Sequence, residues 1–315
     1  MENYKIHIYE MFMRDGLQSL NKTYSIEDKI CFIDLLYNAN FRNIEFGSTT
    51  NPKLLLQMDN SYQLWDYIKK TYIYDDTCNE HHTKSSVKKN FTMLVTNQAN
   101  LQKCIKSNIK SFGLLSSLSD QFGIKNLNKN SDDSFQEMFV RLKTIYENKS
   151  NNTYHTRIYL SCFFGTIEET FDDTYEKKCT YYLNKIMNFI KIYKLQPEYI
   201  DIVLCDTYGV LDDKNLDLIL QNINSYNPDI IKYISLHLHC NTDFYNLINS
   251  GLKNNISKFD SSILNVGGCP FSGKNIHNIN TCELVKYLEE TKYKTSLDYK
   301  KIKEIEEKIK KILQS

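Results

Sequence analysis

Eight alternations of a short strand-like run with a longer helical segment dominate this sequence of 315 residues. The strand candidates are residues 5–10, 43–47, 91–96, 111–115, 157–162, 200–205, 234–239 and 258–264. The helical segments are residues 26–38, 61–70, 98–107, 134–148, 172–194, 214–224, 243–254 and 281–290. Strands that alternate with helices indicate a parallel sheet, and eight such units predict a closed (β/α)₈ barrel, the TIM barrel. An open doubly wound sheet is the alternative.

Two segments fall outside this repeat. Residues 72–90 are polar and irregular, and we interpret them as an inserted, exposed loop, although Cys78, His81 and His82 could bind a metal there. Residues 298–314 are rich in Lys and Glu and carry isoleucines at helical spacing, which predicts an amphipathic helix. We therefore expect a catalytic barrel over residues 1–296 and an extra C-terminal helix over residues 297–315 that packs on it.

The overall composition excludes several classes of partner. Charges nearly cancel, with 39 Lys and Arg against 38 Asp and Glu, which gives no reason to expect a nucleic acid. No apolar run approaches the roughly 20 residues that span a bilayer, so no membrane partner is expected either.

The cysteines and the two ends of the chain bear on location. Nine cysteines without paired spacing favour reduced thiols over a disulfide framework. The first apolar segment starts at Ile6, which leaves no room for a signal or transit peptide, and Leu313-Gln314-Ser315 is not a peroxisomal signal. We expect a cytoplasmic protein.

Two histidines are the most informative candidates for chemistry. His237 and His239 stand two positions apart near the end of the seventh strand, so their side chains project to the same face. Catalytic residues of a barrel lie at the C-terminal ends of its strands. Two histidines and a carboxylate form a common site for a catalytic divalent ion, and Asp15, after the first strand, is the natural carboxylate. Arg14 and Asp15 could instead form only a buried salt bridge.

A glycine-rich loop follows the eighth strand. Gly267-Gly268-Cys269-Pro270 would hold a thiol above the barrel mouth. Glycine allows backbone conformations that are closed to other residues, and mobile loops of this kind cover active sites. A simple turn is the alternative to such a lid.

Six ordered segments together resemble the 3-hydroxy-3-methylglutaryl-CoA lyase family, from about residue 9 to residue 288. They are RDGLQ at 14–18, NIEFGSTTNPKLLLQM at 43–58, SCFFG at 161–165, CDTYGV at 205–210, HLHCNT at 237–242 and VGGCPF at 266–271. The resemblance implies a barrel of the pyruvate carboxyltransferase type that uses Mg²⁺ or Mn²⁺ and an acyl-CoA substrate. It also implies a retro-Claisen cleavage to acetyl-CoA and a 3-oxo acid. For the usual substrate of the family the 3-oxo acid is acetoacetate, a product of leucine catabolism and ketone-body formation.

The resemblance further implies roles for individual residues. The metal ligands would be Asp15, His237, His239 and Asn278. The catalytic residues would be Arg14 on the enolate, Glu45 and Asp206 on the substrate and its protons, and Cys269 on the loop. We expect substrate and CoA contacts from Gln18, Asn97, Ser161 and Thr207. The sequence leaves open whether the protein forms a homodimer.

The chain also departs from the family pattern. Asn241 stands where the family has an aspartate, His277 replaces a usual glycine, and Met11-Phe12-Met13 replace a turn with Gly and Pro. Two alternatives remain. A synthase that condenses acetyl-CoA with a 2-oxo acid would lack the GGCP loop and usually carries an acidic residue where Leu17 stands. A barrel that binds CoA or metal without turnover is the other.

Overall fold

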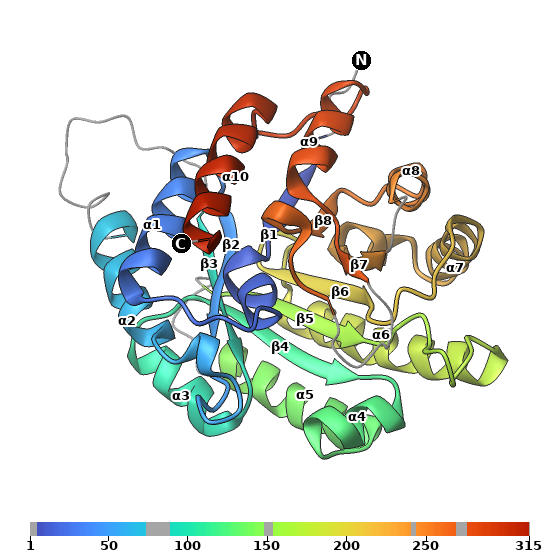
Figure 1. Ribbon diagram of the computed structural model, residues 1–315. Coiled ribbons are helices and arrows are strands. Elements are labelled where there is room, and N and C mark those ends of the chain that lie inside the picture. Colours follow the sequence, from blue (N-terminus) through green and yellow to red (C-terminus); the bar gives the residue numbers. More distant parts are fainter. Residues whose placement is uncertain (1–4, 74–88, 148–153, 241–243, 269–275, 315) are drawn as a thin grey trace.

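Eight parallel strands close into a barrel (Figure 1). The structure, a computed structural model, describes residues 5–73, 89–147, 154–240, 244–268 and 276–314. The strands are β1 His7–Glu10, β2 Asn43–Ser48, β3 Asn90–Val95, β4 Ser111–Ser117, β5 His155–Ser161, β6 Ile200–Asp206, β7 Ile234–Cys240 and β8 Lys258–Ser261. Each strand pairs with the next, and β8 pairs with β1 through Tyr9 and Asp260. The predicted (β/α)₈ barrel is therefore confirmed, and the open sheet is excluded.

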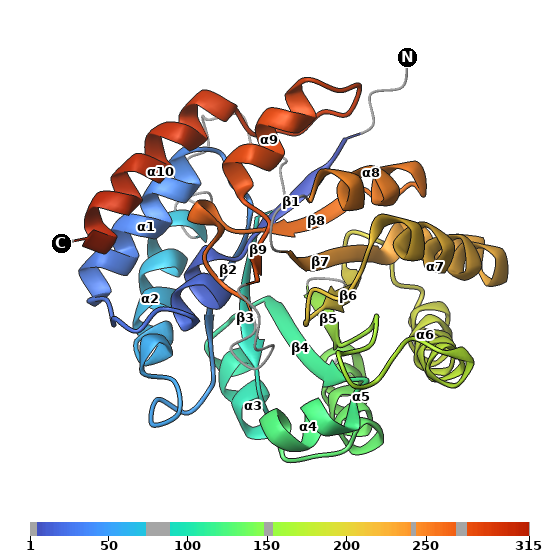
Figure 2. The ribbon, with the colours of Figure 1, turned by 45° about the vertical axis from the view of Figure 1, so that its right-hand side comes forward.

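Helices surround the barrel (Figure 2). They are α1 Ile26–Asn38, α2 Ser61–Ile68, α3 Gln98–Lys106, α4 Asp120–Leu127, α5 Ser131–Glu147, α6 Asp173–Tyr193, α7 Asp213–Tyr226, α8 Tyr245–Lys253, α9 Thr281–Glu289 and α10 Tyr299–Gln314. The sequence pattern predicted all of these except α4. Eight residues that include Gly123 are too few to show a helical period, which explains the omission.

Local capping sets several of these boundaries. Ser25 and Asp28 form a capping box at the start of α1, in which each side chain accepts the backbone N–H of the other. Asp172 accepts the N–H groups of Thr174 and Tyr175 at the start of α6, and Lys194 ends that helix in the left-handed conformation. These signals are local, so the sequence alone predicted both helices closely.

Strand β8 is shorter than predicted. It ends at Ser261, and a 3₁₀ turn, Ile263–Asn265, follows it. Leu264 has a φ of 61°, and its N–H is bonded to the carboxylate of Glu306 on α10. The apolar residues after Ser261 made the strand look longer in the sequence. In the structure they form a turn that is held by α10, a contact between distant parts of the chain that no local pattern predicts.

Charged side chains fill much of the barrel interior. Asp201 on β6 contacts His155 at 3.1 Å and Lys258 at 2.5 Å. One level nearer the C-terminal ends of the strands, Arg157 on β5 donates to Asp260 on β8 at 2.6 Å. A small apolar cluster lies beside them, formed by Tyr9, Met11, Leu94, Tyr159, Val203 and Cys205. The barrel is a packed core, and its charges are paired across strands, as buried charges must be.

The C-terminal helix α10 lies beside α1 and α9 (Figures 1 and 2). Its Ile302, Ile305 and Ile309 are buried, as the helical spacing predicted. No helix in the described part of the chain has the length and apolar character needed to cross a membrane. Of the predicted irregular segment 72–90, Tyr72 and Ile73 continue a helical turn and Asn90 begins β3, while Cys78, His81 and His82 lie outside the described residues.

Candidate metal centre and active site

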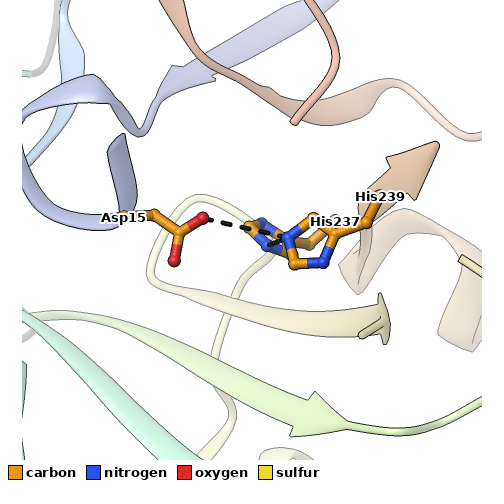
Figure 3. A group of neighbouring side chains, drawn as sticks. All are labelled: Asp15, His237 and His239. Atoms are coloured by element: carbon orange, nitrogen blue, oxygen red, sulfur yellow. Dashed lines mark hydrogen bonds and ion pairs between the residues drawn. The ribbon is translucent and has the colours of Figure 1, made fainter. Parts of the chain in front are cut away.

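Asp15, His237 and His239 meet at the mouth of the barrel. Their ligand atoms all lie within 4.8 Å of one another, and all three residues are buried. Figure 3 shows Asp15 reaching from the turn after β1 toward the two imidazoles on β7. The two Nε2 atoms are 3.0 Å apart, and Asp15 Oδ2 is 3.8 Å from His239 Nε2. The same-face placement predicted for the two histidines is what brings them together.

Each imidazole is oriented by a partner on its other nitrogen. His239 Nδ1 lies 3.1 Å from the carbonyl oxygen of Thr207, which can only accept, so this nitrogen carries the proton. His237 Nδ1 lies 3.0 Å from the carboxylate of Asp260, which favours the same tautomer. Both Nε2 lone pairs then face one another. Such an arrangement requires a positive charge between them, and it matches the way metal-binding histidines are held in proteins.

Electrostatics favour positive charge at this point. Burial disfavours the charged form of Asp15, but the charge of Arg14 and a bond to His239 outweigh it and hold the pKa of Asp15 far below its usual range. Burial also works against a charged His239, yet contact with Asp15 raises the pKa of His239 overall. A proton or a divalent cation can supply the charge that this cluster lacks. The three residues therefore fit a divalent metal ion.

Asn278 joins the cluster through an unpredicted short strand. β9, His277–Asn278, pairs antiparallel with β7 and places Asn278 opposite His239. Asn278 Nδ2 donates to Asp15 Oδ2 at 2.7 Å and to the carbonyl of Val266 at 3.0 Å. The amide nitrogen, not the oxygen, faces Asp15 in this structure. Asn278 thus supports Asp15, and its role as a ligand stays a prediction.

Gly267 leaves the space that Asn278 occupies. Its φ is 110°, and a Cβ there would overlap Asn278 Nδ2 and come within 2.8 Å of Asp15 Oδ2. The glycines were predicted to allow backbone conformations that are closed to other residues, and the φ of Gly267 is one of these. The structure adds a second requirement, since any side chain at Gly267 would displace two groups of the candidate metal centre.

Arg14 bridges two carboxylates beside the cluster. Its Nη1 donates to Asp15 at 2.7 Å and its Nε donates to Glu45 at 2.6 Å. Burial raises the pKa of Glu45, although the charge of Arg14 opposes this. The second oxygen of Glu45 is buried and has no hydrogen-bond partner among the described residues. The salt bridge predicted as an alternative for Arg14 and Asp15 is present and is part of the same site.

A large cleft opens above these residues. Its volume is about 1630 Å³, and its wall includes Arg14, Asp15, His237 and His239. All four residues predicted to contact the substrate line the same cleft, namely Gln18, Asn97, Ser161 and Thr207. The residue types and the concave shape are those of a small-molecule site.

Comparisons with known proteins point to one family. No family model matches the chain. Among curated proteins, the hydroxymethylglutaryl-CoA lyase of Bacillus subtilis is 27% identical over 319 residues, which cover 99% of this chain and 95% of that protein. The mitochondrial human hydroxymethylglutaryl-CoA lyase is 25% identical over 303 residues, covering 95% and 83% of the two chains. Along nearly its whole length, the chain is therefore similar to curated hydroxymethylglutaryl-CoA lyases.

A solved structure shares the whole fold. The lyase from Acinetobacter baumannii, in complex with coenzyme A and 3-methylmalate, superposes with a TM-score of 0.77 at 19% identity. The match covers 100% of this chain and 93% of that one. At this level of identity the likeness shows the fold alone. It agrees with the closed barrel.

Asp206, another predicted catalytic residue, is bonded to the backbone of its own turn. Its two oxygens accept the backbone N–H groups of Val210 at 3.0 Å and Leu211 at 3.1 Å. It is fully buried and is absent from the described residues that line the cleft. In this structure Asp206 closes the turn after β6, and a catalytic role for it stays a prediction. Its neighbour Thr207 contributes both the carbonyl that orients His239 and a side chain on the cleft wall.

Two predicted features cannot be placed. Cys269 and Asn241 lie outside the described residues. Conversely, sequence reasoning missed two residues at the centre of the site. Tyr159 on β5 lines the cleft beneath Arg14, and Asp260 on β8 contacts His237. A charged residue inside a predicted barrel strand was the available signal for Asp260, because such a residue must have a buried partner.

Proposed function

We propose that this protein is a carbon–carbon lyase that cleaves 3-hydroxy-3-methylglutaryl-CoA, or a similar 3-hydroxyacyl-CoA, in a retro-Claisen reaction. The substrate loses its hydroxyl proton, the C2–C3 bond breaks, and C2 takes up a proton. The products are acetyl-CoA and a 3-oxo acid, which is acetoacetate for the methylglutaryl substrate. The observation that carries this proposal is the meeting of Asp15, His237 and His239 with Arg14 at one point of the barrel mouth.

Asp15, His237 and His239 would hold Mg²⁺ or Mn²⁺, with Asn278 as a fourth ligand if its amide turns. Mixed nitrogen and oxygen ligation at a site open to a cleft suits such an ion. When bound, the ion supplies Lewis-acid polarisation of the substrate hydroxyl and carboxylate oxygens. The partners Thr207 and Asp260 support this assignment, because they keep both Nε2 lone pairs turned toward the shared point.

Arg14 would act on the thioester end of the substrate. Its guanidinium is held by Asp15 and Glu45, so it is preorganised to stabilise the negative charge that develops on the enolate oxygen. Glu45 would accept or return a proton, since one of its oxygens has no partner among the described residues. Cys269 would complete the closed site from its loop, as the resemblance implies.

The cleft supports an acyl-CoA substrate. About 1630 Å³ exceeds the roughly 300–1,000 Å³ of most ligand pockets, which leaves room for a substrate with a long arm. Four cationic residues from α3 to α5 line it: Lys103, Lys125, Lys129 and Arg141. Glu137, at 2.7 Å from Lys129 and 3.7 Å from Arg141, is the acidic residue among them. This excess of positive charge complements the phosphates of CoA.

A cytoplasmic location is part of the proposal. The cysteines at the described positions 31, 104, 179, 205 and 282 are free thiols, as expected in a reducing compartment.

A product assay tests the function. The protein is incubated with Mg²⁺ or Mn²⁺ and 3-hydroxy-3-methylglutaryl-CoA, and acetyl-CoA and acetoacetate are quantified. Equal amounts of both products are expected, with loss of activity on chelation and recovery on adding the ion back. Consumption of acetyl-CoA in the presence of a 2-oxo acid would instead support a condensing synthase. Unchanged acyl-CoA under all conditions would contradict the lyase.

A further inference from the structure

Asp260 contacts the candidate metal centre from inside the barrel. It lies on β8, is 2% exposed, and was not among the residues expected to form the site. One oxygen lies 3.0 Å from His237 Nδ1, and the other accepts from Arg157 Nη2 at 2.6 Å. A single carboxylate therefore joins a candidate metal ligand to a buried arginine.

Arg157 fixes the position of that carboxylate. Its side chain is fully buried, its guanidinium stacks 3.6 Å from the centre of the Tyr9 ring, and Nη2 also donates to Ser235 at 3.1 Å. A guanidinium can only donate hydrogen bonds. With either Asp or Asn at position 260, the side-chain atom that faces Arg157 must therefore be an acceptor.

We propose that Asp260 is a positioning residue that holds His237 with its proton on Nδ1 and its Nε2 lone pair directed at the point shared with Asp15 and His239. In this role Asp260 raises the affinity for the divalent cation without touching it. The proposal rests on the proposed metal site. It is independent of which acyl-CoA the protein cleaves.

Asp260→Asn gives the sharpest test, because the geometry dictates how an amide would sit there. The amide oxygen must face Arg157, so the amide nitrogen must face His237 Nδ1 and donate to it. His237 would then carry its proton on Nε2, where the cation should bind. The shape of the side chain is conserved while the tautomer is reversed, a substitution logic known from the aspartate of serine protease triads.

Mn²⁺ affinity, measured by EPR or calorimetry on the substrate-free protein, is the first readout. Loss of a partner of a metal-binding histidine typically costs about 10- to 100-fold in metal affinity, and we expect a loss in this range or above for Asp260→Asn. Nitrogen NMR of the metal-free protein is the second readout. It should find His237 protonated on Nδ1 in the parent and on Nε2 in the variant.

Asp201→Asn is the matched control. Asp201 is an equally buried carboxylate on β6 that contacts His155, Arg157 and Lys258, and the structure shows no contact between it and either metal-site histidine. This variant should lose stability but keep its Mn²⁺ affinity within about twofold of the parent.

The outcomes separate the two proposals. Parent-like Mn²⁺ affinity in Asp260→Asn, or an equal loss in Asp201→Asn, overturns the positioning role. If Asp260→Asn fails to fold, the parent spectrum decides, and a His237 that is protonated on Nε2 and not on Nδ1 overturns the proposal. A parent that binds no Mn²⁺ overturns both the metal site and the role of Asp260. A parent that binds Mn²⁺ but leaves 3-hydroxy-3-methylglutaryl-CoA intact refutes only the proposed reaction.

Discussion

Replacement of Gly267 by alanine should damage the metal centre, although Gly267 is not itself a proposed metal ligand. The backbone at Gly267 has a φ of 110°, which L-residues rarely adopt. A left-handed conformation costs a residue with a Cβ about 1–2 kcal/mol. The added Cβ would also overlap Asn278 Nδ2, so Asn278 must move away.

The displaced contacts set the size of the effect. Asn278 donates to the charged Asp15 at 2.7 Å and to the Val266 carbonyl at 3.0 Å. Hydrogen bonds to charged groups contribute about 1.5–3 kcal/mol and neutral ones about 1 kcal/mol. With the backbone strain, Gly267→Ala should lower the free energy of unfolding by about 3.5–6 kcal/mol. Mn²⁺ affinity should fall by about tenfold or more, because Asp15 loses a partner that orients it.

Gly268→Ala provides the control for this prediction. Gly268 has a φ of 126°, and a Cβ there would overlap the backbone carbonyl of Ile276 rather than a side chain of the site. Urea unfolding and Mn²⁺ titration are measured for both variants. Both should be destabilised, and only Gly267→Ala should lose metal affinity. Equal metal affinity in Gly267→Ala and the parent, or an equal loss in both variants, would refute the reasoning.

Three further predictions address protons, the enolate and the loop. Burial raises the pKa of Glu10 from 4.5 to about 7 against the hydrogen bonds that it accepts, so the folded state retains a proton that the unfolded state has released. Stability should therefore fall by about 3 kcal/mol as the pH rises from 4.5 to 7. Glu10→Gln, whose amide can still accept from Phe12 and Ile263, should remove this slope in urea titrations, and an unchanged slope would exclude Glu10 as its source. Arg14→Met should lower kcat by about 10²–10³, and turnover within threefold of the parent would remove Arg14 from the mechanism. Cys269→Ser should keep fold and metal but lose most activity, and a CoA ester should protect Cys269 of the parent from alkylation; full activity with no protection would make the loop structural.

Local signals in the sequence determined the secondary structure and the chemical inventory of the site. The eightfold alternation predicted the barrel, and side-chain caps such as Ser25 and Asp28 set helix boundaries within a few residues. The period of two along β7 placed His237 and His239 on one face. The alternation, the caps and the period of two each depend on residues that are close together in the chain. They could therefore be recognised from the sequence without knowledge of the fold.

The tertiary structure decided how those residues are held. The pairing of β9 with β7 brings Asn278 to Asp15, and it turns the amide nitrogen toward the carboxylate. Asp206 was expected to take part in the chemistry, but in the structure its oxygens accept the backbone N–H groups of Val210 and Leu211 in the turn after β6. Asp260 entered the site only because β8 closes against β7 and brings it under His237. Side-chain direction and hydrogen-bond partners depend on strand pairing across long stretches of chain, and no local pattern specifies them.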